Sequence, residues 1–573
     1  AASSPAFAQG GGASSTGSIS GQVVDDSGGV LPGVTVTATS PAQMGTLSAV
    51  TNEEGMFRFP SVPPGSYKVQ FELAGFSTMV REDIRVTLGF NAAVNVKLAV
   101  ATLQETVTVT AETEVMQTET GAREGVLSAK QIDNLSIISR SSLELLRILP
   151  GVVAPDNTSL ESIGFGSGAN ANANYHVNGL RGEQNNVTID GSRMIDIGSN
   201  NGTVITANPD MVQEVKVQTS NYAAEHGTSA VQISATTKGG SSGFHGSVYD
   251  YIRHWRFQAN DRSNSINSTP GNIIDRPKSK YNYPGGNIGG PVLLPGTNFN
   301  RNRDKLFFFV GFELYRQQVD EGSKLLRVPT LKERQGDFSE SGANIFVPAG
   351  CTANGVTGNA GENSNIDRAP NGDLRPCADP LGRALLNFYP APNRSVPFGQ
   401  NNYVYSTLRP NDRNQFTSRF DYAISDKTKM YVRFAREYEE QGFPRGLWWD
   451  SSAYELPGKL TSKNLGRSVV VNLTNIINPS MTNEILFSAS KLKLNYDFQE
   501  PDKVSWAGLG LKPVGFFSTS NPNIPASLQN QNPYVPLSVI TWGQGDFHTA
   551  YGYPILAWND SFAITDNLVK VQN

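Results

Sequence analysis

The sequence feature that most constrains the fold is a set of segments after Gly246 in which apolar and polar residues alternate. In residues 415–424 one face carries Phe416, Phe420, Tyr422 and Ile424, and the other carries Gln415, Thr417, Arg419 and Asp421. Beyond a turn at 425–428, Met430, Val432 and Phe434 oppose Lys429, Arg433 and Glu437. This period of two predicts β-strands with one apolar and one polar face. A soluble β-sandwich also alternates, but it seldom has charged residues along its whole second face.

Two further regions repeat the pattern. Residues 306–314 place Leu306, Phe308, Val310, Phe312 and Leu314 on one face, and the strands at 469–473 and 485–489 are joined by a turn at 478–480. Strands of about 10 residues, joined by alternately short and very long connections, are what a membrane-spanning antiparallel barrel requires. No window of about 18 apolar residues is present, so no transmembrane helix is expected.

The composition fits a mainly β protein of several domains. The chain has 573 residues, with 56 Gly, 33 Pro and 17% charged residues, which is typical of a folded, loop-rich protein. A net charge of −4 provides no basic field, which argues against nucleic acid as a partner. Ala6-Phe7-Ala8 is typical of the end of a secretory signal peptide, although a disordered tail would have the same composition.

Residues 18–100 predict a β-sandwich. Short alternating strands are separated by turns such as those at 25–29 and 63–65, and this spacing is typical of about seven strands. The segment contains no set of zinc ligands and no nucleophile with a neighbouring base. We interpret it as a binding or spacing module.

Residues 115–240 mix one helix with strands and predict a small α/β domain. A capping box at 141–144 begins the expected helix, and Pro150 ends it. Alternation at 187–191 and 211–218 indicates two strands, the first closed by an Asp-Gly turn.

The β-branched segment Glu105–Ala111, between these two domains, allows two interpretations. It is either the last strand of the sandwich or linker, or an extended peptide that a partner captures by edge pairing. Edge pairing relies on main-chain hydrogen bonds and demands little of the side chains. The residues alone leave both interpretations open.

Three motifs carry a family resemblance: NGLRGEQNNVTIDG at 178–191, NPDMVQEVKVQTSNYAAEHG at 208–227 and TTKGGSSGFHGSVYDY at 236–251. They resemble the plug-to-barrel junction of TonB-dependent outer-membrane receptors, and most closely the Oar-like branch. That branch carries a carboxypeptidase-regulatory-like domain, which GQVVDDSGGVLPGVTVTAT at 21–39 resembles. The resemblance covers nearly the whole chain in the right order.

The resemblance implies a domain plan and a set of site residues. The expected domains are a signal remnant and linker (1–17), the sandwich (18–100), a TonB-box linker (101–114), the plug (115–240) and the N-terminal part of a transmembrane β-barrel (241–573). The implied TonB box is Glu105, Thr106, Val107, Thr108 and Val109. The implied plug motif is Asn178, Gly179, Arg181, Asn185, Asp190 and Gly191. We expect Arg181 to find a carboxylate inside the barrel, although a solvated loop arginine is the alternative.

The resemblance also implies an energy-coupled receptor in the outer membrane of a Gram-negative-type cell. Its partners would be a TonB-type inner-membrane energy transducer, outer-membrane lipid, an extracellular ligand and a surface lipoprotein. The Oar-like branch favours a large ligand, namely a peptide, protein or oligosaccharide, and leaves export of a protein open. The competing function is a non-transporting surface or adhesion protein anchored by its barrel. Because too few residues follow residue 240 to complete the barrel, we expect the chain to be an N-terminal fragment.

Residues 317–413 are predicted to form a long external loop. It contains both cysteines, Cys351 and Cys377, which in an exported protein favour a disulfide over metal ligation. A short helix is expected after Asp379, with Pro380 at its first position. The Trp448-Trp449 pair fits an interfacial aromatic girdle or loop packing, with a ligand surface as the alternative.

The residue patterns of common enzymes are missing. The five histidines never occur at i,i+4 spacing with a Glu between them, so the sequence gives no zincin site. His245 and His254 are interpreted as interfacial or lumen-facing polar residues. The glycines at 164–168 lack the Lys-Ser/Thr of a P-loop. We therefore expect neither an enzyme nor a cofactor or metal site.

Overall fold

The structure is a computed structural model of the 573-residue chain. It describes residues 16–41, 45–100, 106–110, 123–135, 140–153, 176–181, 184–198, 202–221, 231–268, 275–342, 345–358, 368–369, 372–444, 459–478, 481–508, 510, 540–542, 545–547 and 555–570. The predicted signal remnant, the first TonB-box residue Glu105, the glycines at 164–168 and Trp448-Trp449 lie outside the described residues.

The first domain is a β-sandwich, as predicted. One sheet contains β4 (Met56–Val62), β1 (Gly17–Asp25), β7 (Asn91–Ala93) and β8 (Val96–Leu98). The other has the order β3 (Leu47–Val50), β2 (Thr35–Thr39), β5 (Gly65–Glu72), β6 (Thr78–Val86) and β9 (Thr106–Thr110). Alternate side chains of both sheets fill one apolar core that includes Val36, Phe57 and Phe71.

The second domain is the predicted small α/β unit. Its sheet has the order β10 (Arg123–Ser128), β15 (Val212–Ser220), β16 (Val231–Thr237), β13 (Asn185–Ile189) and β14 (Ser192–Arg193). It also contains α1 (Ala129–Asn134), the two-stranded β11 (Val152–Val153) and β12 (His176–Val177), and a 3-10 helix at Ser142–Ile148. The expected capping box at 141–144 is wrong, because Ser141 makes no side-chain cap hydrogen bond and the helix is 3-10 rather than α.

The third part is an open, curved wall of eight antiparallel strands. Their order is β17 (His245–His254), β18 (Lys280–Pro291), β19 (Leu306–Leu326), β24 (Tyr403–Ala423), β25 (Thr428–Phe443), β26 (Leu460–Asn478), β27 (Met481–Phe498) and β30 (Ile555–Lys570). Several strands are about twice as long as expected, with 21 residues each in β19 and β24. They continue through polar segments where the apolar alternation fades.

The two faces of the wall differ as the alternation predicts. On β24 the outward-facing Phe420 is 45% exposed, whereas its neighbours Arg419 and Asp421 are buried. On β19, Phe312 is 42% exposed and the adjacent Glu313 is buried. An apolar exposed face and a polar buried face fit a wall between lipid and a plugged lumen. Among the described residues, no helix is long and apolar enough to cross a membrane.

The connection between β19 and β24 is shorter than predicted. It spans residues 327–402 instead of 317–413, because both strands extend into the expected loop. The loop contains α3 (Pro380–Asn387), strands β20 (Ile345–Phe346), β21 (Thr352–Ala353), β22 (Val356–Thr357) and β23 (Arg368–Ala369), and 3-10 helices at Glu333–Gln335, Ser339–Ser341 and Arg375–Cys377. Elsewhere the structure has α2 (Arg262–Asn267), β28 (Ile540–Trp542), β29 (Gly545–Phe547), and 3-10 helices at Trp255–Phe257 and Pro501–Lys503.

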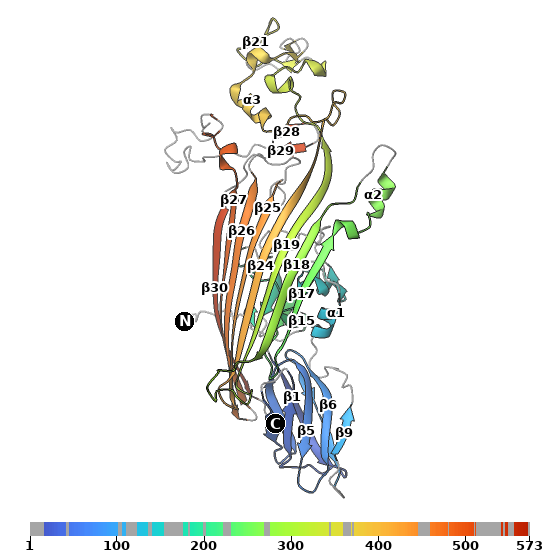
Figure 1. Ribbon diagram of the computed structural model, residues 1–573, viewed down its shortest axis with the longest axis vertical. Coiled ribbons are helices and arrows are strands. Elements are labelled where there is room, and N and C mark those ends of the chain that lie inside the picture. Colours follow the sequence, from blue (N-terminus) through green and yellow to red (C-terminus); the bar gives the residue numbers. More distant parts are fainter. Residues whose placement is uncertain are drawn as a thin grey trace, which may run out of the picture.

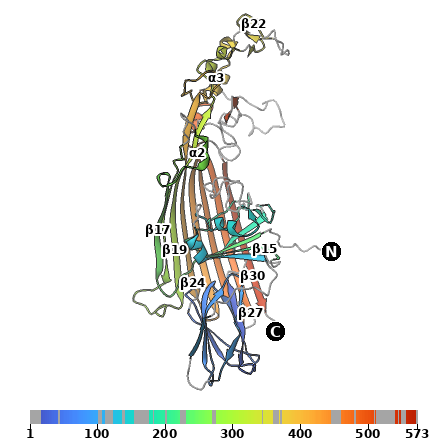
Figure 2. The same ribbon diagram turned by 90° about the vertical axis from the view of Figure 1, so that its right-hand side faces the viewer.

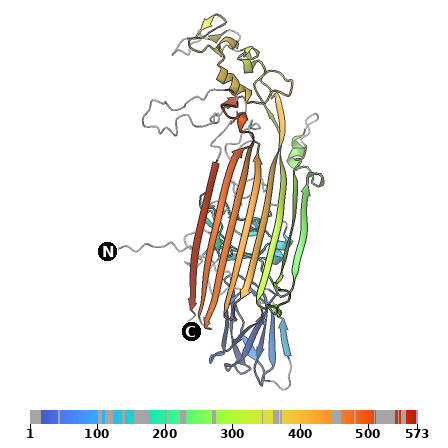
Figure 3. The same cartoon turned by 60° about the vertical axis from the view of Figure 1, so that its left-hand side comes forward.

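The parts are arranged along one long axis. The sandwich, drawn in blue, lies at one end of the wall, and the loop with α3 extends from the other end (Figure 1). The α/β domain lies against the concave side of the wall (Figure 2), and the wall strands run roughly along the long axis (Figure 3). The α/β domain therefore occupies the position of a plug.

Candidate functional site

The predicted Asp190-Gly191 turn is the centre of the contact between plug and wall. Asp190 and Gly191 have positive φ angles of 51° and 77°, as a tight turn between β13 and β14 requires. The Asp190 carboxylate is fully buried, and it accepts hydrogen bonds from Thr237 N (2.9 Å) and Thr237 Oγ1 (2.8 Å). The turn therefore holds a negative charge at the surface of the plug.

Two arginines of the wall meet this carboxylate. Arg433 Nε of β25 lies 3.2 Å from Asp190 Oδ2, and Arg419 Nη1 of β24 lies 3.4 Å from Asp190 Oδ1. Arg419 also pairs with Asp421 at 2.9 Å. The Tyr431 hydroxyl donates to the Asp190 carbonyl oxygen at 3.2 Å. Two carboxylates thus balance two guanidinium groups in a buried cluster, which we call the Asp190 cluster.

A second polar contact lies further along the same two strands. Glu437 Oε2 accepts from Thr206 N at 2.7 Å, and Glu437 Oε1 accepts from Thr206 Oγ1 at 2.8 Å. Arg413 Nη1 lies 3.3 Å from Glu437 Oε1, and Gln415 Nε2 donates to the Thr206 carbonyl oxygen at 2.6 Å. The wall therefore holds the plug loop around Thr206 through its main chain as well as its side chain.

The third contact is built on Arg140, immediately before the 3-10 helix of the plug. Its guanidinium pairs with Asp210 of the plug, and Arg140 Nη2 lies 2.6 Å from Glu313 Oε2 of β19. Tyr249 of β17 donates its hydroxyl proton to the same Glu313 oxygen at 3.1 Å. Arg140 thus makes the buried plug-to-wall ion pair that we predicted for Arg181.

These contacts make the plug–wall interface mainly polar. The apolar core of the plug includes Ala435 and Leu492 of the wall, Leu494 of the wall packs against it, and the remaining residues belong to the plug. Burying charged pairs costs desolvation energy that offsets much of their mutual attraction, so such pairs add little net adhesion. An interface of this kind fixes one orientation of the plug without the adhesion of a large apolar contact.

The other predicted plug residues have more local roles. Asn178 and Gly179 form a turn with φ angles of 52° and 79°, and Asn185 is a buried residue of β13 that pairs with Val231 of β16. Arg181 is exposed, and its guanidinium makes no ion pair with any described residue. This exposure agrees with the solvated-loop alternative for Arg181.

The predicted TonB box has a partner strand within the chain. Thr106–Thr110 pairs in parallel with β6, with Thr78 opposite Thr106 and Glu82 opposite Thr110. It is the last described strand in the order of its sheet. Residues 106–110 are therefore not a free peptide but a paired strand. The pairing agrees with the first interpretation, a last strand of the sandwich, and it leaves one edge of β9 unpaired among the described strands.

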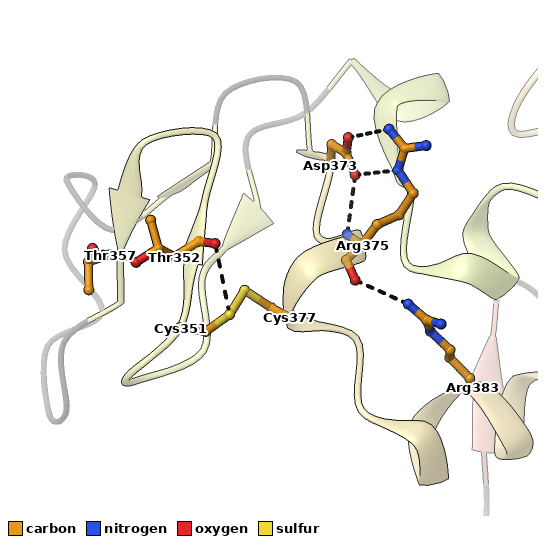
Figure 4. Close-up of a disulfide and its surroundings, with 7 residues drawn as sticks. All are labelled: Cys351, Thr352, Thr357, Asp373, Arg375, Cys377 and Arg383. Carbon is orange, nitrogen blue, oxygen red and sulfur yellow. Dashed lines mark hydrogen bonds and ion pairs between the residues drawn. A yellow bond between two sulfur atoms is a disulfide. The ribbon is translucent and has the colours of Figure 1, made fainter.

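The long connection at 327–402, which we predicted to be an external loop, is held by a covalent and a polar anchor. Cys351 and Cys377 are joined by a disulfide with their Cα atoms 5.8 Å apart (Figure 4). Arg334 donates to the carbonyl oxygens of Tyr389 (2.9 Å) and Leu386 (3.1 Å), near the end of α3. The loop is therefore a folded unit rather than a simple connection.

The described residues contain no group of three or more His, Cys, Asp or Glu side chains arranged to hold a metal ion. His245 is exposed on β17, and His254 accepts a hydrogen bond from Arg256 N at 3.2 Å. Both histidines lie on the wall strand where the sequence placed them.

Comparisons with known proteins agree with this architecture. Family models match the chain as a carboxypeptidase regulatory-like domain at 18–99, a TonB-dependent receptor plug domain at 117–232 and an outer membrane beta barrel domain at 236–573. The TonB-dependent transporter Oar of Myxococcus xanthus is 30% identical over 355 residues, which cover 59% of this chain and 30% of Oar.

Two solved structures share parts of the fold at low sequence identity. The outer membrane transporter YddB from Escherichia coli has a TM-score of 0.40 at 10% identity, covering 66% of this chain and 40% of that chain. The ferric preacinetobactin receptor BauA from Acinetobacter baumannii has a TM-score of 0.34 at 11% identity, covering 79% and 56%. The barrel model alone matches more than half of the chain. The chain belongs to the TonB-dependent receptors of the outer membrane, with a carboxypeptidase regulatory-like domain in front of its plug.

Proposed function

We propose that this chain is part of an energy-coupled transporter whose plug moves aside when a periplasmic partner pulls on residues 105–109. The main support is the polar plug–wall interface, in which buried ion pairs around Asp190, Thr206 and Arg140 hold the plug in one orientation. Such pairs exchange one set of polar partners for another, or for water, when the plug moves. Members of this family are transporters rather than enzymes.

The proposed partner is the periplasmic part of a TonB-type inner-membrane energy transducer. Strand β9 offers an edge for main-chain pairing, because it is the last of the described strands in its sheet. A partner strand that adds to this edge would gain main-chain hydrogen bonds whatever the side chains are. The pairing of β9 with β6 does not block the other edge.

The proposed ligand is large, namely a peptide, protein or oligosaccharide. The outward unit at 327–402 supports this proposal, because it extends well beyond the end of the wall and is folded around the Cys351–Cys377 disulfide (Figure 1). Long folded loops on a rigid scaffold commonly carry binding function. A surface lipoprotein is the proposed accessory partner on the same side.

Deleting residues 105–111 tests the proposal. We expect the deletion to abolish both binding of the transducer's periplasmic domain and energy-dependent uptake, while surface binding of ligand persists. A deletion of equal length at 9–15 is the matched control and should change neither. If uptake and transducer binding survive the deletion of 105–111, the proposal is wrong, and the non-transporting surface or adhesion protein is the better account.

A further inference from the structure

One residue of the sandwich, Leu88, is held by both of its main-chain polar groups between two ionisable side chains of the plug. The Leu88 N–H donates to Glu214 Oε1 at 2.8 Å, and the Leu88 carbonyl oxygen accepts from Lys216 Nζ at 2.7 Å. Leu88, Glu214 and Lys216 are all buried. We call this arrangement the Leu88 clasp.

Lys216 also reaches a second strand of the plug. Its Nζ lies 2.8 Å from Glu124 Oε2, and the Lys216 and Glu124 side chains are only 7% and 14% exposed. Glu124 lies in β10, which pairs with β15 and is the first plug strand after the segment 106–110. One buried ammonium group therefore connects the sandwich, β15 and the start of β10.

Leu88 lies close in the chain to β6, the strand that pairs with β9. β6 ends at Val86, two residues before Leu88, and β9 pairs along β6. A displacement of β9 together with its sheet would therefore act on the Leu88 peptide directly. It would disturb Lys216 before it could separate β10 from β15.

We propose that the sandwich is a lock on the plug: the Leu88 clasp keeps β10 paired with β15, and moving the sandwich away from the plug releases β10. The lock is a property of the closed receptor, and its use as a gate rests on the transport function proposed above. The plug surface that carries Glu214 and Lys216 thus binds the receptor's own N-terminal domain.

Hydrogen exchange by mass spectrometry tests the lock in the receptor as the cell makes it, purified in detergent. Glu214→Leu removes the acceptor of Leu88 N–H and leaves the Lys216–Glu124 pair intact. Because the buried Leu88 N–H is left without an acceptor, we expect the amides of Leu88 and of residues 123–128 to exchange faster by between about 10-fold and 100-fold. Amides of β13 and β16 should keep their rates.

Three further variants sharpen the test. Lys216→Met removes both contacts of the ammonium group, to the Leu88 carbonyl oxygen and to Glu124, and should accelerate exchange of residues 123–128 at least as much as Glu214→Leu. Glu214→Gln keeps an acceptor and should preserve the wild-type rates. Lys68→Met removes an ion pair with Glu82 inside the sandwich and is the matched control, because Lys68 and Glu82 are partly exposed and the pair lies outside the clasp.

The proposal is overturned if residues 123–128 keep their wild-type exchange in both Glu214→Leu and Lys216→Met while Leu88 is freed. It is equally overturned if Leu88 stays protected in both variants. Neither result depends on the transducer, whose binding to the wild-type receptor is measured separately. A receptor with an intact lock that fails to bind the transducer would contradict the proposed function alone.

Discussion

Asp190 and Arg433 form an ion pair between plug and wall in which neither side chain has any exposed surface. Their carboxylate oxygen and guanidinium nitrogen lie 3.2 Å apart, although the residues are 243 positions apart in the chain. The contact depends on the plug being inside the wall, because a buried charge is costly without its partner. Its loss should therefore report directly on plug seating.

We predict that Asp190→Asn lowers the free energy that holds the plug against the wall by about 3–5 kcal/mol, because it leaves the buried Arg433 guanidinium without its charge partner. The measurement is the stability of the plug against denaturant, monitored by hydrogen exchange of the Thr237 amide, which donates to Asp190. Asp373→Asn, which affects an exposed ion pair with Arg375 in the external loop, is the control.

A double variant makes this prediction specific. Asp190→Asn combined with Arg433→Met should recover part of the loss, since the uncompensated charge is then absent. If the loss in the double variant equals the sum of the losses in the two single variants, the two residues do not interact.

We predict that docking of the sandwich on the plug weakens as pH rises. Burial raises the pKa of Glu214 from 4.5 to about 7. The hydrogen bond from Leu88 N–H and the charges of Arg85 and Lys216 lower this pKa, the charge of Glu124 raises it, and the effect of burial is the largest. A carboxyl group whose pKa is raised in the docked state favours docking fully below its ordinary pKa of 4.5, and this contribution is lost as pH rises through about 7.

Spin labels at Lys97 in the sandwich and Ile148 in the plug, both exposed, would measure this docking. The distance distribution should broaden between pH 4.5 and 7 and change little above that range. Glu214→Gln, which does not titrate, should make it independent of pH. The same pH response in wild type and Glu214→Gln would assign the effect to another group.

The disulfide of the external loop is predicted to stabilise that loop by about 3 kcal/mol, because it closes 26 residues around a small apolar cluster. Replacing Cys351 and Cys377 together with Ser should speed limited proteolysis of residues 327–402. Plug stability should stay the same, since the loop lies at the far end of the wall (Figure 1). Unchanged proteolysis would show that the polar anchors around Arg334 are sufficient.

Much of the architecture could be predicted because it depends on local patterns. The alternation of Phe420 with Arg419 and Asp421 indicated which face is apolar, and the Asp190-Gly191 turn required a positive φ angle. Arg419, Arg433 and Glu437 appeared in the sequence as the polar face of two strands. The sequence could not show which plug residues they meet, because those contacts join positions more than 200 residues apart.

The misses have physical causes as well. Arg140 was overlooked in favour of Arg181 because nothing near Arg140 indicates Glu313, its partner 173 positions later. The strands β19 and β24 continue past the apolar pattern because their ladder hydrogen bonds do not require apolar side chains. The partner of β9 was missed because parallel pairing leaves no local signal in a β-branched segment.

The second half of the chain forms a lipid-embedded wall, with the plug on its polar face. This placement can be measured with single spin labels at successive positions from Gln415 to Tyr422 in the receptor reconstituted into bilayers. We predict that labels at 416, 420 and 422 are accessible to oxygen dissolved in lipid and inaccessible to a water-soluble relaxation agent, whereas labels at 415, 417, 419 and 421 are shielded from both. Equal access of oxygen to both sets of positions, or ready access of the water-soluble agent to 416, 420 and 422, would contradict this placement.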